Sequence, residues 1–471
     1  MDRPTLWIDV EDIFLYAQAN PRPSGIQRVC FELCKALREA GAPVRFVRHH
    51  GNDGFAEVTW ADLAGLFGRL TDTHRPGGSP LAQPAEAGPH GKISRALRGL
   101  VHPLPFALRR SLGELMRAQA AALRAWVKAA REARRAVAQA LNPPPGPPTG
   151  DTGHFRAEVR AGDWLVTLGA PWDHPAYGEK ISAARARHGL RFALLSYDLF
   201  PIRFAEYCNA GLVRLFTAWC DDVLPRANAI FAISNSTATD VEARLSELGV
   251  TDPPAVWVLP MGTGFGGGPA ASQRTPRLPP AGTYALIVST IEARKNHQMA
   301  FRAWRQLLRE RPADQVPTLV FAGRVGWMVE DLLQQIRNTH ALGGKLLIVS
   351  DPTDGEVSAL YEGCLFTMMP SFAEGWGLPV SESHGFGKPC FAANRTALPE
   401  SGAGLARLFD PDNLNDLLAE LRQLLDDPTD LPAWTEKVRN NFVPTPWSAA
   451  ADVLIGHLHS DSVGTTIRNL E

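Results

Sequence analysis

The fold is decided by the stretch Cys364-Leu-Phe-Thr-Met-Met-Pro370, followed by Glu374-Gly-Trp-Gly-Leu-Pro-Val-Ser-Glu382 and Ser-His-Gly-Phe-Gly-Lys-Pro389. Its apolar run predicts a buried strand, its glycines predict a turn, and the residues after the turn predict a helix start. A helix start directs unpaired backbone N–H groups and a positive dipole end at a ligand, which suits a diphosphate. Because carboxylates repel phosphate, we expect Glu374 and Glu382 to face hydroxyl groups. A nucleotide-sugar carries both kinds of group.

Outward from this stretch, apolar runs alternate with helical patterns on both sides of a Gly/Pro-rich passage, Gly262 to Gly282. At 471 residues the chain exceeds one ordinary core. The alternation predicts two doubly wound parallel sheets, an α/β fold with two Rossmann-like domains. Strands are expected at 5–10, 44–47, 164–168, 192–195, 229–233 and 256–259, with a helix over 25–40, and then at 284–288, 318–321, 346–349, 365–368 and 389–392.

The segment 374–382 resembles the Glu-x7-Glu motif of family 4 retaining glycosyltransferases. Further similar motifs follow in the same order over about residues 5 to 450, at 22–28, 196–201, 232–237, 288–297 and 321–327. The resemblance implies the GT-B fold, in which two Rossmann-like domains face a cleft. The expected domains are 1–265 on the acceptor side and 283–445 for the nucleotide-sugar, joined by a hinge at 266–282. A final segment, 446–471, is expected to hold a helix that crosses back to the first domain.

The resemblance also implies roles for residues of the second domain. Glu374 would approach the transferred sugar, and Glu382, expected in the first helical turn, would hold the ribose. Arg294 and Lys295 would clamp the diphosphate, since a planar guanidinium and a compact ammonium complement phosphate oxygens. The remaining expected donor contacts are the backbone N–H groups of Gly377 and Leu378, together with Ser289 and Arg324 at two strand ends.

In the first domain, Ser24 and Gly25 open a helix and are expected to bring backbone N–H groups to the phosphate. Arg28 lies one turn further, on the acceptor side. Asp198 stands where many relatives carry a His-Asp pair, and Tyr197 replaces the His. Asp198 either contacts hydroxyl groups, with a catalytic role, or caps the turn that follows.

Trp172 and Asp173 follow a predicted strand and are further acceptor-side candidates. No metal and no cofactor is expected. Asp410-Pro-Asp412 has metal-site spacing, but Leu408 to Asn413 is interpreted as a polar turn. Gly262-Thr-Gly-Phe-Gly-Gly267 spells a dinucleotide fingerprint, yet the prolines after it preclude the required helix.

Residues 75–155 interrupt the alternation and predict a helical insertion. Between Lys92 and Arg135, eleven Lys/Arg oppose Glu114 and Glu132, which gives +9; the whole chain carries −1, so the remainder carries −10. The insertion either packs as a solvated helix or docks on an anionic membrane surface through 92–135. The near-neutral total argues against nucleic acid as a partner. Without a signal sequence or a spanning segment, a cytoplasmic location is expected, peripheral at the inner face of the membrane if the insertion binds lipid.

Together these features predict a metal-independent, retaining hexosyltransferase. Its partners would be a nucleotide-sugar donor and a glycan or lipid-linked glycan acceptor in bacterial surface polysaccharide (lipopolysaccharide) synthesis. GDP-mannose is favoured over dTDP-rhamnose or a UDP-sugar. Two alternatives stay open: a nucleotide-sugar 2-epimerase of the same fold, and a catalytically silent scaffold.

Overall fold

The computed structural model describes residues 3–20, 22–50, 54–71, 155, 158–174, 176–264 and 271–459. The predicted insertion, including its basic segment 92–135, therefore lies outside the described residues apart from Phe155. The hinge at 266–282 is described from residue 271 onward, and the final segment up to residue 459.

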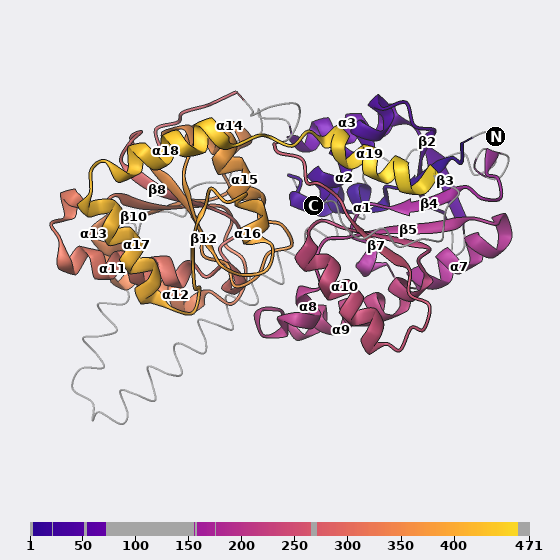
Figure 1. Ribbon diagram of the computed structural model, residues 1–471, viewed down its shortest axis with the longest axis horizontal. Coiled ribbons are helices and arrows are strands. Elements are labelled where there is room, and N and C mark those ends of the chain that lie inside the picture. Colours follow the sequence, from indigo (N-terminus) through magenta and orange to yellow (C-terminus); the bar gives the residue numbers. More distant parts are fainter. Residues whose placement is uncertain are drawn as a thin grey trace, which may run out of the picture. The chain divides into compact units, whose positions relative to one another are not determined.

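The first sheet has seven strands in the order β3-β2-β1-β4-β5-β6-β7 (Figure 1). All pairs are parallel except that of β2 and β3. Buried apolar residues fill the central strands, as expected for a sheet covered on both faces. The strands span Leu6–Asp9 (β1), Val44–His50 (β2), Gly54–Val58 (β3), Trp164–Thr167 (β4), Arg191–Ser196 (β5), Ala229–Ala232 (β6) and Ala255–Val258 (β7).

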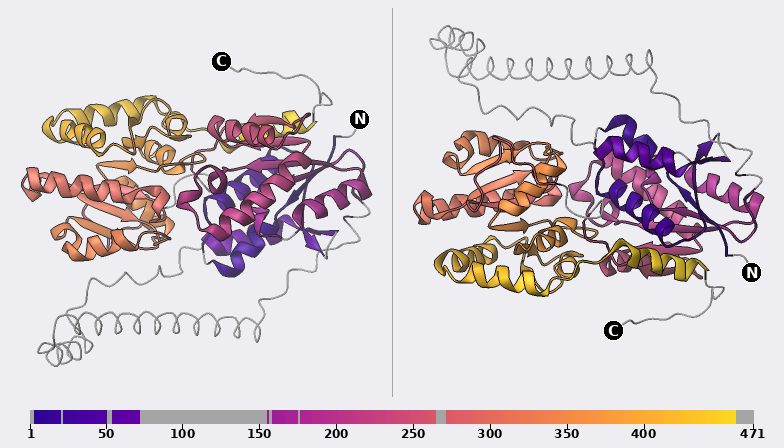
Figure 2. Two further views of the ribbon diagram at one scale, coloured as in Figure 1. Left: turned by 90° about the horizontal axis from the view of Figure 1, so that it is seen from below. Right: turned by 90° about the horizontal axis from the view of Figure 1, so that it is seen from above.

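The second sheet has six parallel strands in the order β10-β9-β8-β11-β12-β13. Parallel strands need crossovers, and helices supply them on both faces of each sheet (Figure 2). The strands span Tyr284–Val288 (β8), Thr318–Ala322 (β9), Leu346–Val349 (β10), Phe366–Met369 (β11), Cys390–Ala393 (β12) and Arg407–Phe409 (β13).

Helices of the first domain span Glu11–Ala19 (α1), Gly25–Glu39 (α2), Trp60–Thr71 (α3), Tyr177–His188 (α7), Phe200–Arg203 (α8), Ala210–Val223 (α9) and Asn235–Glu247 (α10). Those of the second span His297–Glu310 (α11), Glu330–Asn338 (α12), His340–Gly343 (α13), Asp354–Gly363 (α14), Leu378–Gly385 (α15), Leu398–Ser401 (α16), Leu414–Asp426 (α17) and Asp430–Asn441 (α18). Short 3-10 helices are Pro171–Asp173, Ala205–Tyr207, Leu224–Arg226, Ala293–Lys295 and Ala313–Gln315.

The last described helix, Trp447–His459 (α19), belongs to the core of the first sheet although it follows the second sheet in the sequence. Ala450, Ala451, Leu454 and Leu458 are fully buried there, and α19 lies beside α2 (Figure 1). Burial of this apolar face ties the carboxyl-terminal segment to the first sheet.

The interpretation of Leu408 to Asn413 as a polar turn is wrong at its start. Leu408 and Phe409 belong to β13, which pairs with β12 and contributes the buried Phe409 to the core. Asp410 and Asp412 follow the strand and pair with Arg395, at 3.5 and 2.6 Å. A short edge strand with one buried residue carries too little periodicity to be recognised.

Candidate functional site

The turn between β11 and α15 places the motif. Gly377 caps α15 with a φ of 95°, which favours glycine, and a Cβ there would lie 2.6 Å from Cδ2 of Leu398. Leu378 is the first helical residue and Pro379 the second, where the missing N–H of proline is harmless. The expectation that Glu382 lies in the first turn is wrong: it is the fifth residue of α15, because the helix starts only after Gly377.

A cavity of about 530 Å³ lies in front of this turn. Its walls come from both domains, at the carboxyl ends of the strands, where open parallel sheets bind ligands. The sequence-predicted residues that line it are Ser24, Gly25, Arg28, Asp198, Ser289, Arg294, Lys295, Glu374, Gly377, Leu378 and Glu382. Motifs that are far apart in the sequence therefore meet at one site.

Glu374 is paired with both predicted clamp residues. Lys295 Nζ lies 2.5 Å from Glu374 Oε1, and Arg294 Nη1 lies 3.2 Å from Glu374 Oε2. Arg294 also pairs with Glu292 at 2.8 Å and donates to the carbonyl of Ala373 at 2.6 Å. The 3-10 helix Ala293–Lys295 holds the two cations side by side. The clamp and the acid thus form one buried charge cluster.

Burial and pairing set the charges of this cluster. Burial favours the neutral form of Glu374, but Lys295 and Arg294 outweigh it, so the pKa of this carboxyl lies below its ordinary value. Burial, together with neighbouring Arg294, lowers the pKa of Lys295 despite its pairing with Glu374. An ionised carboxylate between two cations can respond to positive charge that develops in a bound sugar.

Glu382 lies in a different environment. The hydroxyl of Tyr361 donates a 2.8 Å hydrogen bond to Oε2 of Glu382. Burial raises the pKa of the Glu382 carboxyl, against the effects of Tyr361 and of Arg28. Arg28 reaches from the first domain to Asp354 at the start of α14, with 2.7 Å between Nη2 and Oδ1. Glu382 therefore has lone pairs left for ligand hydroxyl groups.

On the wall formed by the first domain, the Ser24 N–H has a partner within the protein, and the contact of Ser24 and Gly25 with phosphate stays a prediction. The N–H and the hydroxyl of Ser24 both donate to Oε1 of Gln27, at 3.2 and 2.5 Å. This pair forms a capping box, which satisfies the helix start internally. Asp198 accepts the N–H of Phe200 at 3.2 Å, so it caps the following turn while also lining the cavity.

Three predicted site residues are not among those that line this cavity: Trp172, Asp173 and Arg324. Trp172 packs edge-on against Phe216, with 5.5 Å between ring centroids. The residue that the sequence offered as an acceptor contact therefore packs against the core. Asp173 lines a separate, smaller cavity of the first domain. The Arg324 side chain is exposed.

Sequence reasoning missed Tyr361, Glu292 and Phe200. The Arg294 guanidinium lies over the Phe200 ring, 4.6 Å from its centroid, in cation–π geometry. The signal that could have found Phe200 is its place in the 196–201 motif. Tyr361 lies in a helix whose pattern indicates only a buried face.

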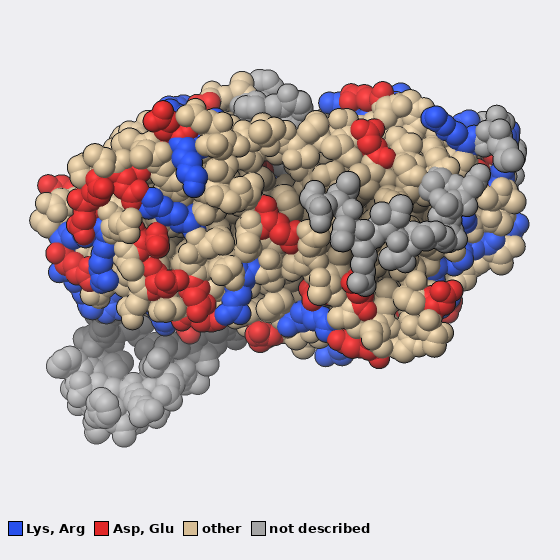
Figure 3. All heavy atoms as spheres, in the orientation of Figure 1, with Lys and Arg blue, Asp and Glu red and all other residues tan. Residues whose placement is uncertain are grey.

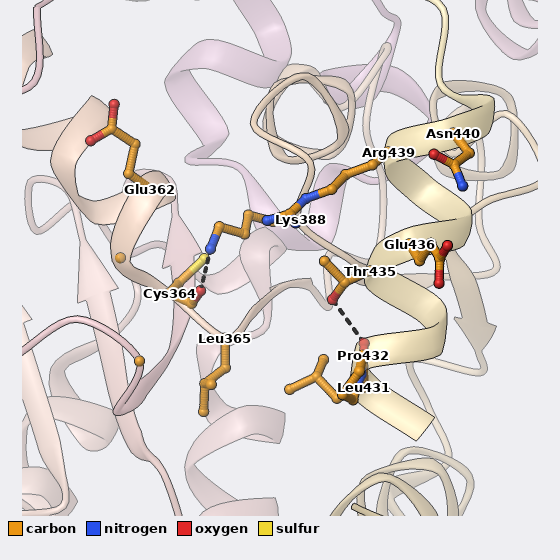
Figure 4. A pocket seen from close by; sticks show the side chains of 12 residues that line it. Glu362, Cys364, Leu365, Lys388, Leu431, Pro432, Thr435, Glu436, Arg439 and Asn440 are labelled. Atoms are coloured by element: carbon orange, nitrogen blue, oxygen red, sulfur yellow. Dashed lines mark hydrogen bonds between the residues drawn. The ribbon is translucent and has the colours of Figure 1, made fainter. Parts of the chain in front are cut away.

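A second hollow of about 530 Å³ lies elsewhere on the second domain, before the amino ends of β11 and β12 (Figure 4). Two of its polar side chains have partners within the protein. Lys388 Nζ donates to the carbonyl of Cys364 at 2.9 Å, and the Thr435 hydroxyl donates to the carbonyl of Leu431, one turn earlier in α18, at 2.8 Å. It gathers none of the predicted site residues.

On the face shown in Figure 3, the described Lys/Arg side chains are interspersed with Asp/Glu side chains and form no continuous basic patch that would suit a polyanionic partner. In the part of the chain that the structure describes, no helix is long and apolar enough to cross a membrane. Nor do three or more His, Cys, Asp or Glu side chains of the described residues gather as metal ligands.

Two solved structures match this architecture over nearly the whole chain. A glycosyltransferase from Rickettsia africae is 13% identical, with a TM-score of 0.53 over 98% of this chain and 100% of that one. A sucrose-phosphate synthase from Thermosynechococcus elongatus is 16% identical, with a TM-score of 0.53 over 97% of this chain and 98% of that one. The predicted GT-B fold is confirmed.

The second domain matches a family model. Residues 271–441 match the model of the glycosyl transferases group 1, and the resemblance read from the motifs is confirmed. The O-antigen chain mannosyltransferase B of Escherichia coli is 32% identical over 144 residues, which are 31% of this chain and 37% of the relative.

Other relatives are similar over comparable stretches. A serotype-specific mannosyltransferase WbdA of Escherichia coli is 26% identical over 225 residues, 44% of this chain and 26% of the relative. A D-inositol 3-phosphate glycosyltransferase of Kineococcus radiotolerans is 28% identical over 237 residues, 46% of this chain and 54% of the relative. The matched segments thus span between about a quarter and about half of the relatives' length.

Proposed function

We propose that this protein transfers a hexose from a nucleotide diphosphate-sugar to a glycan or lipid-linked glycan, with retention of anomeric configuration and without a metal ion. The observation that carries the proposal is the charge cluster of Glu374, Lys295 and Arg294 in the cavity before α15. It combines two cations for a diphosphate with a carboxylate for the sugar. Retention rests on the motif's resemblance to family 4 enzymes.

The reaction breaks the bond between the anomeric carbon and the diphosphate oxygen, and forms a bond from the same carbon to an acceptor oxygen on the same face. The acceptor proton passes to the departing phosphate oxygen. Arg294 and Lys295 stabilise the negative charge of the leaving diphosphate, and the N–H groups at the start of α15 contribute dipole stabilisation. Ionised Glu374 favours the positive charge that develops at the anomeric carbon.

The donor would be GDP-mannose, and the product would be part of a bacterial surface polysaccharide. Support comes from the mannosyltransferases of Escherichia coli to which the chain is similar. Arg294 and Lys295 take the place of a metal ion, so EDTA should leave the rate unchanged. We place the protein in the cytoplasm, at the inner face of the membrane if the basic segment 92–135 binds anionic lipid.

The test is NMR analysis of the linkage made from α-linked GDP-mannose, with methyl α-mannopyranoside as the probe acceptor. An α-linked product supports the proposal. A β-linked product overturns retention. Free sugar released at a rate independent of the acceptor overturns the transferase in favour of a 2-epimerase, whose product is free sugar and nucleotide.

A further inference from the structure

A cavity of about 210 Å³ lies in the first domain, separate from the nucleotide-sugar cavity. It sits at the carboxyl ends of β1, β2 and β4, against helix α1. Its volume is that of about seven molecules of liquid water, enough for one monosaccharide ring and too small for a nucleotide. The lining residues on which the argument rests are Asp9, Asp12, Leu15, Tyr16, His49 and Gly169.

The floor of this cavity is a fixed polar network. Asp9 accepts hydrogen bonds from the Tyr177 hydroxyl at 2.7 Å and from the N–H of Glu11 at 3.0 Å, and it lies 2.8 Å from His49 Nε2. The His49 side chain is 92% buried, at 8% exposure, and its Nδ1 bonds to none of the described residues. A buried polar atom without a partner beside a cavity indicates a group that a ligand or water completes.

Asp12 brings a carboxylate to the wall. Gln27 Nε2 donates to Asp12 Oδ2 at 2.9 Å, and the backbone of Ala170 also hydrogen-bonds to this carboxylate; its two oxygens offer about four acceptor sites, so it can accept a further hydrogen bond from a ligand. Burial raises the pKa of Asp12 to about 6. The chain makes room for this side chain at Gly169, where a Cβ would lie 2.9 Å from Cβ of Asp12.

Hydrogen bonds through Gln27 link the wall of the small cavity to the wall of the nucleotide-sugar cavity. This side chain donates to Asp12 on one side and accepts from Ser24, which lines the donor cavity, on the other. A second connection runs through Tyr197, which lines the donor cavity and donates to the carbonyl of Leu168 at 2.7 Å, next to Gly169. Hydrogen-bonded side chains therefore link the walls of the two cavities.

We propose that this cavity binds one neutral sugar unit of the acceptor, with Asp12 accepting a hydroxyl hydrogen bond and Tyr16 and Leu15 supplying the apolar side. The proposal deepens the proposed function and rests on it. The acids of the wall repel an anionic ligand. They do not gather as a metal-ligand group among the described residues. A polyhydroxylated neutral ring satisfies both conditions and can hydrogen-bond to Asp12 and to Nδ1 of His49 at once.

The experiment uses the full-length protein and two probes, methyl α-mannopyranoside and GDP, with binding followed by ligand-observed NMR. Asp12→Asn keeps the side-chain shape and removes the charge, and should weaken glycoside binding about 10-fold to 100-fold while GDP binding stays unchanged. Ala19→Trp, at the exposed end of α1, should block the cavity without removing a hydrogen bond. Asp252→Asn makes the same chemical change at an exposed residue that lines neither cavity, and should have no effect.

The outcomes separate this proposal from the proposed function. Wild-type protein that binds GDP but not the glycoside, or Asp12→Asn and Ala19→Trp variants that bind the glycoside as well as wild type does, would overturn the acceptor cavity alone. Wild-type protein that fails to bind GDP, GDP-mannose or any other nucleotide-sugar would overturn the proposed function. Selective loss of glycoside binding in both cavity variants supports the assignment.

Discussion

Replacing Glu374 by Gln should affect turnover and nucleotide binding in opposite directions. In the described state the carboxylate lies 2.5 Å from Lys295 and 3.2 Å from Arg294, so it competes with a diphosphate for the same two cations. Removing one negative charge about 5 Å from a phosphate, at an effective dielectric constant of 20 to 80, favours binding by roughly 1–3 kcal/mol. The dissociation constant for GDP should therefore fall at least about fivefold.

The same change removes the carboxylate that stabilises developing positive charge on the sugar, and turnover should drop about 10²–10³-fold. The measurements are isothermal titration with GDP and kcat at saturating donor, with melting temperature as the control for folding. Arg294 keeps Glu292 and the Ala373 carbonyl as partners, so the cluster should survive. Weaker GDP binding with unchanged kcat would refute the assignment of Glu374 to the sugar and of the cations to the diphosphate.

Three further predictions concern other parts of the chain. Glu382→Gln should weaken donor binding by about 1.5–3 kcal/mol with little change in kcat, measured as KM against kcat; an unchanged KM contradicts ribose binding. Burial, with Lys295, lowers the pKa of His297 to about 3 from 6.5. Between pH 6.5 and about pH 3, His297 is therefore protonated in the unfolded chain and neutral in the folded chain. Stability should therefore fall as pH drops below about 6.5, by up to about 1.4 kcal/mol per unit, and His297→Gln should flatten the melting temperature against pH; an unaltered slope contradicts this. Deleting residues 80–148 should reduce sedimentation with anionic vesicles and leave transfer to methyl α-mannopyranoside intact, whereas undiminished sedimentation refutes membrane docking.

The sheets could be predicted from the sequence because parallel strands are buried on both faces and appear as short apolar runs. Tyr284–Val288 and Leu346–Val349 coincide with the expected strands. Two strands, β3 and β13, were missed because they do not appear as apolar runs. β3 lies at an edge and mixes buried with half-buried residues, and β13 has only three residues, so neither gives an apolar run.

The sequence predicted which residues form the donor site, but not which of their charged side chains pair with one another. Each motif indicated its own group, and the cavity brings most of them together. That Lys295 and Glu374 pair directly depends on two loops that are 79 residues apart in the sequence. Neither loop carries a local signal for the other.

On the acceptor side, the sequence drew attention to one residue that packs in the core and away from one that lines a cavity. Trp172 stood out in the sequence because it is large and follows a strand, yet its ring packs in an aromatic cluster with Phe216 and Trp219. Asp12 did not stand out, because an acid in the first turn of a helix is ordinarily a surface residue that complements the dipole. Its contact with Gln27 on another helix and the missing side chain at Gly169 turn it into a half-buried wall residue. Asp12 acquires this role because α2 and the loop after β4 pack against it, which only the tertiary structure shows, whereas Asp173, an acceptor-side candidate from the sequence, lines the same cavity.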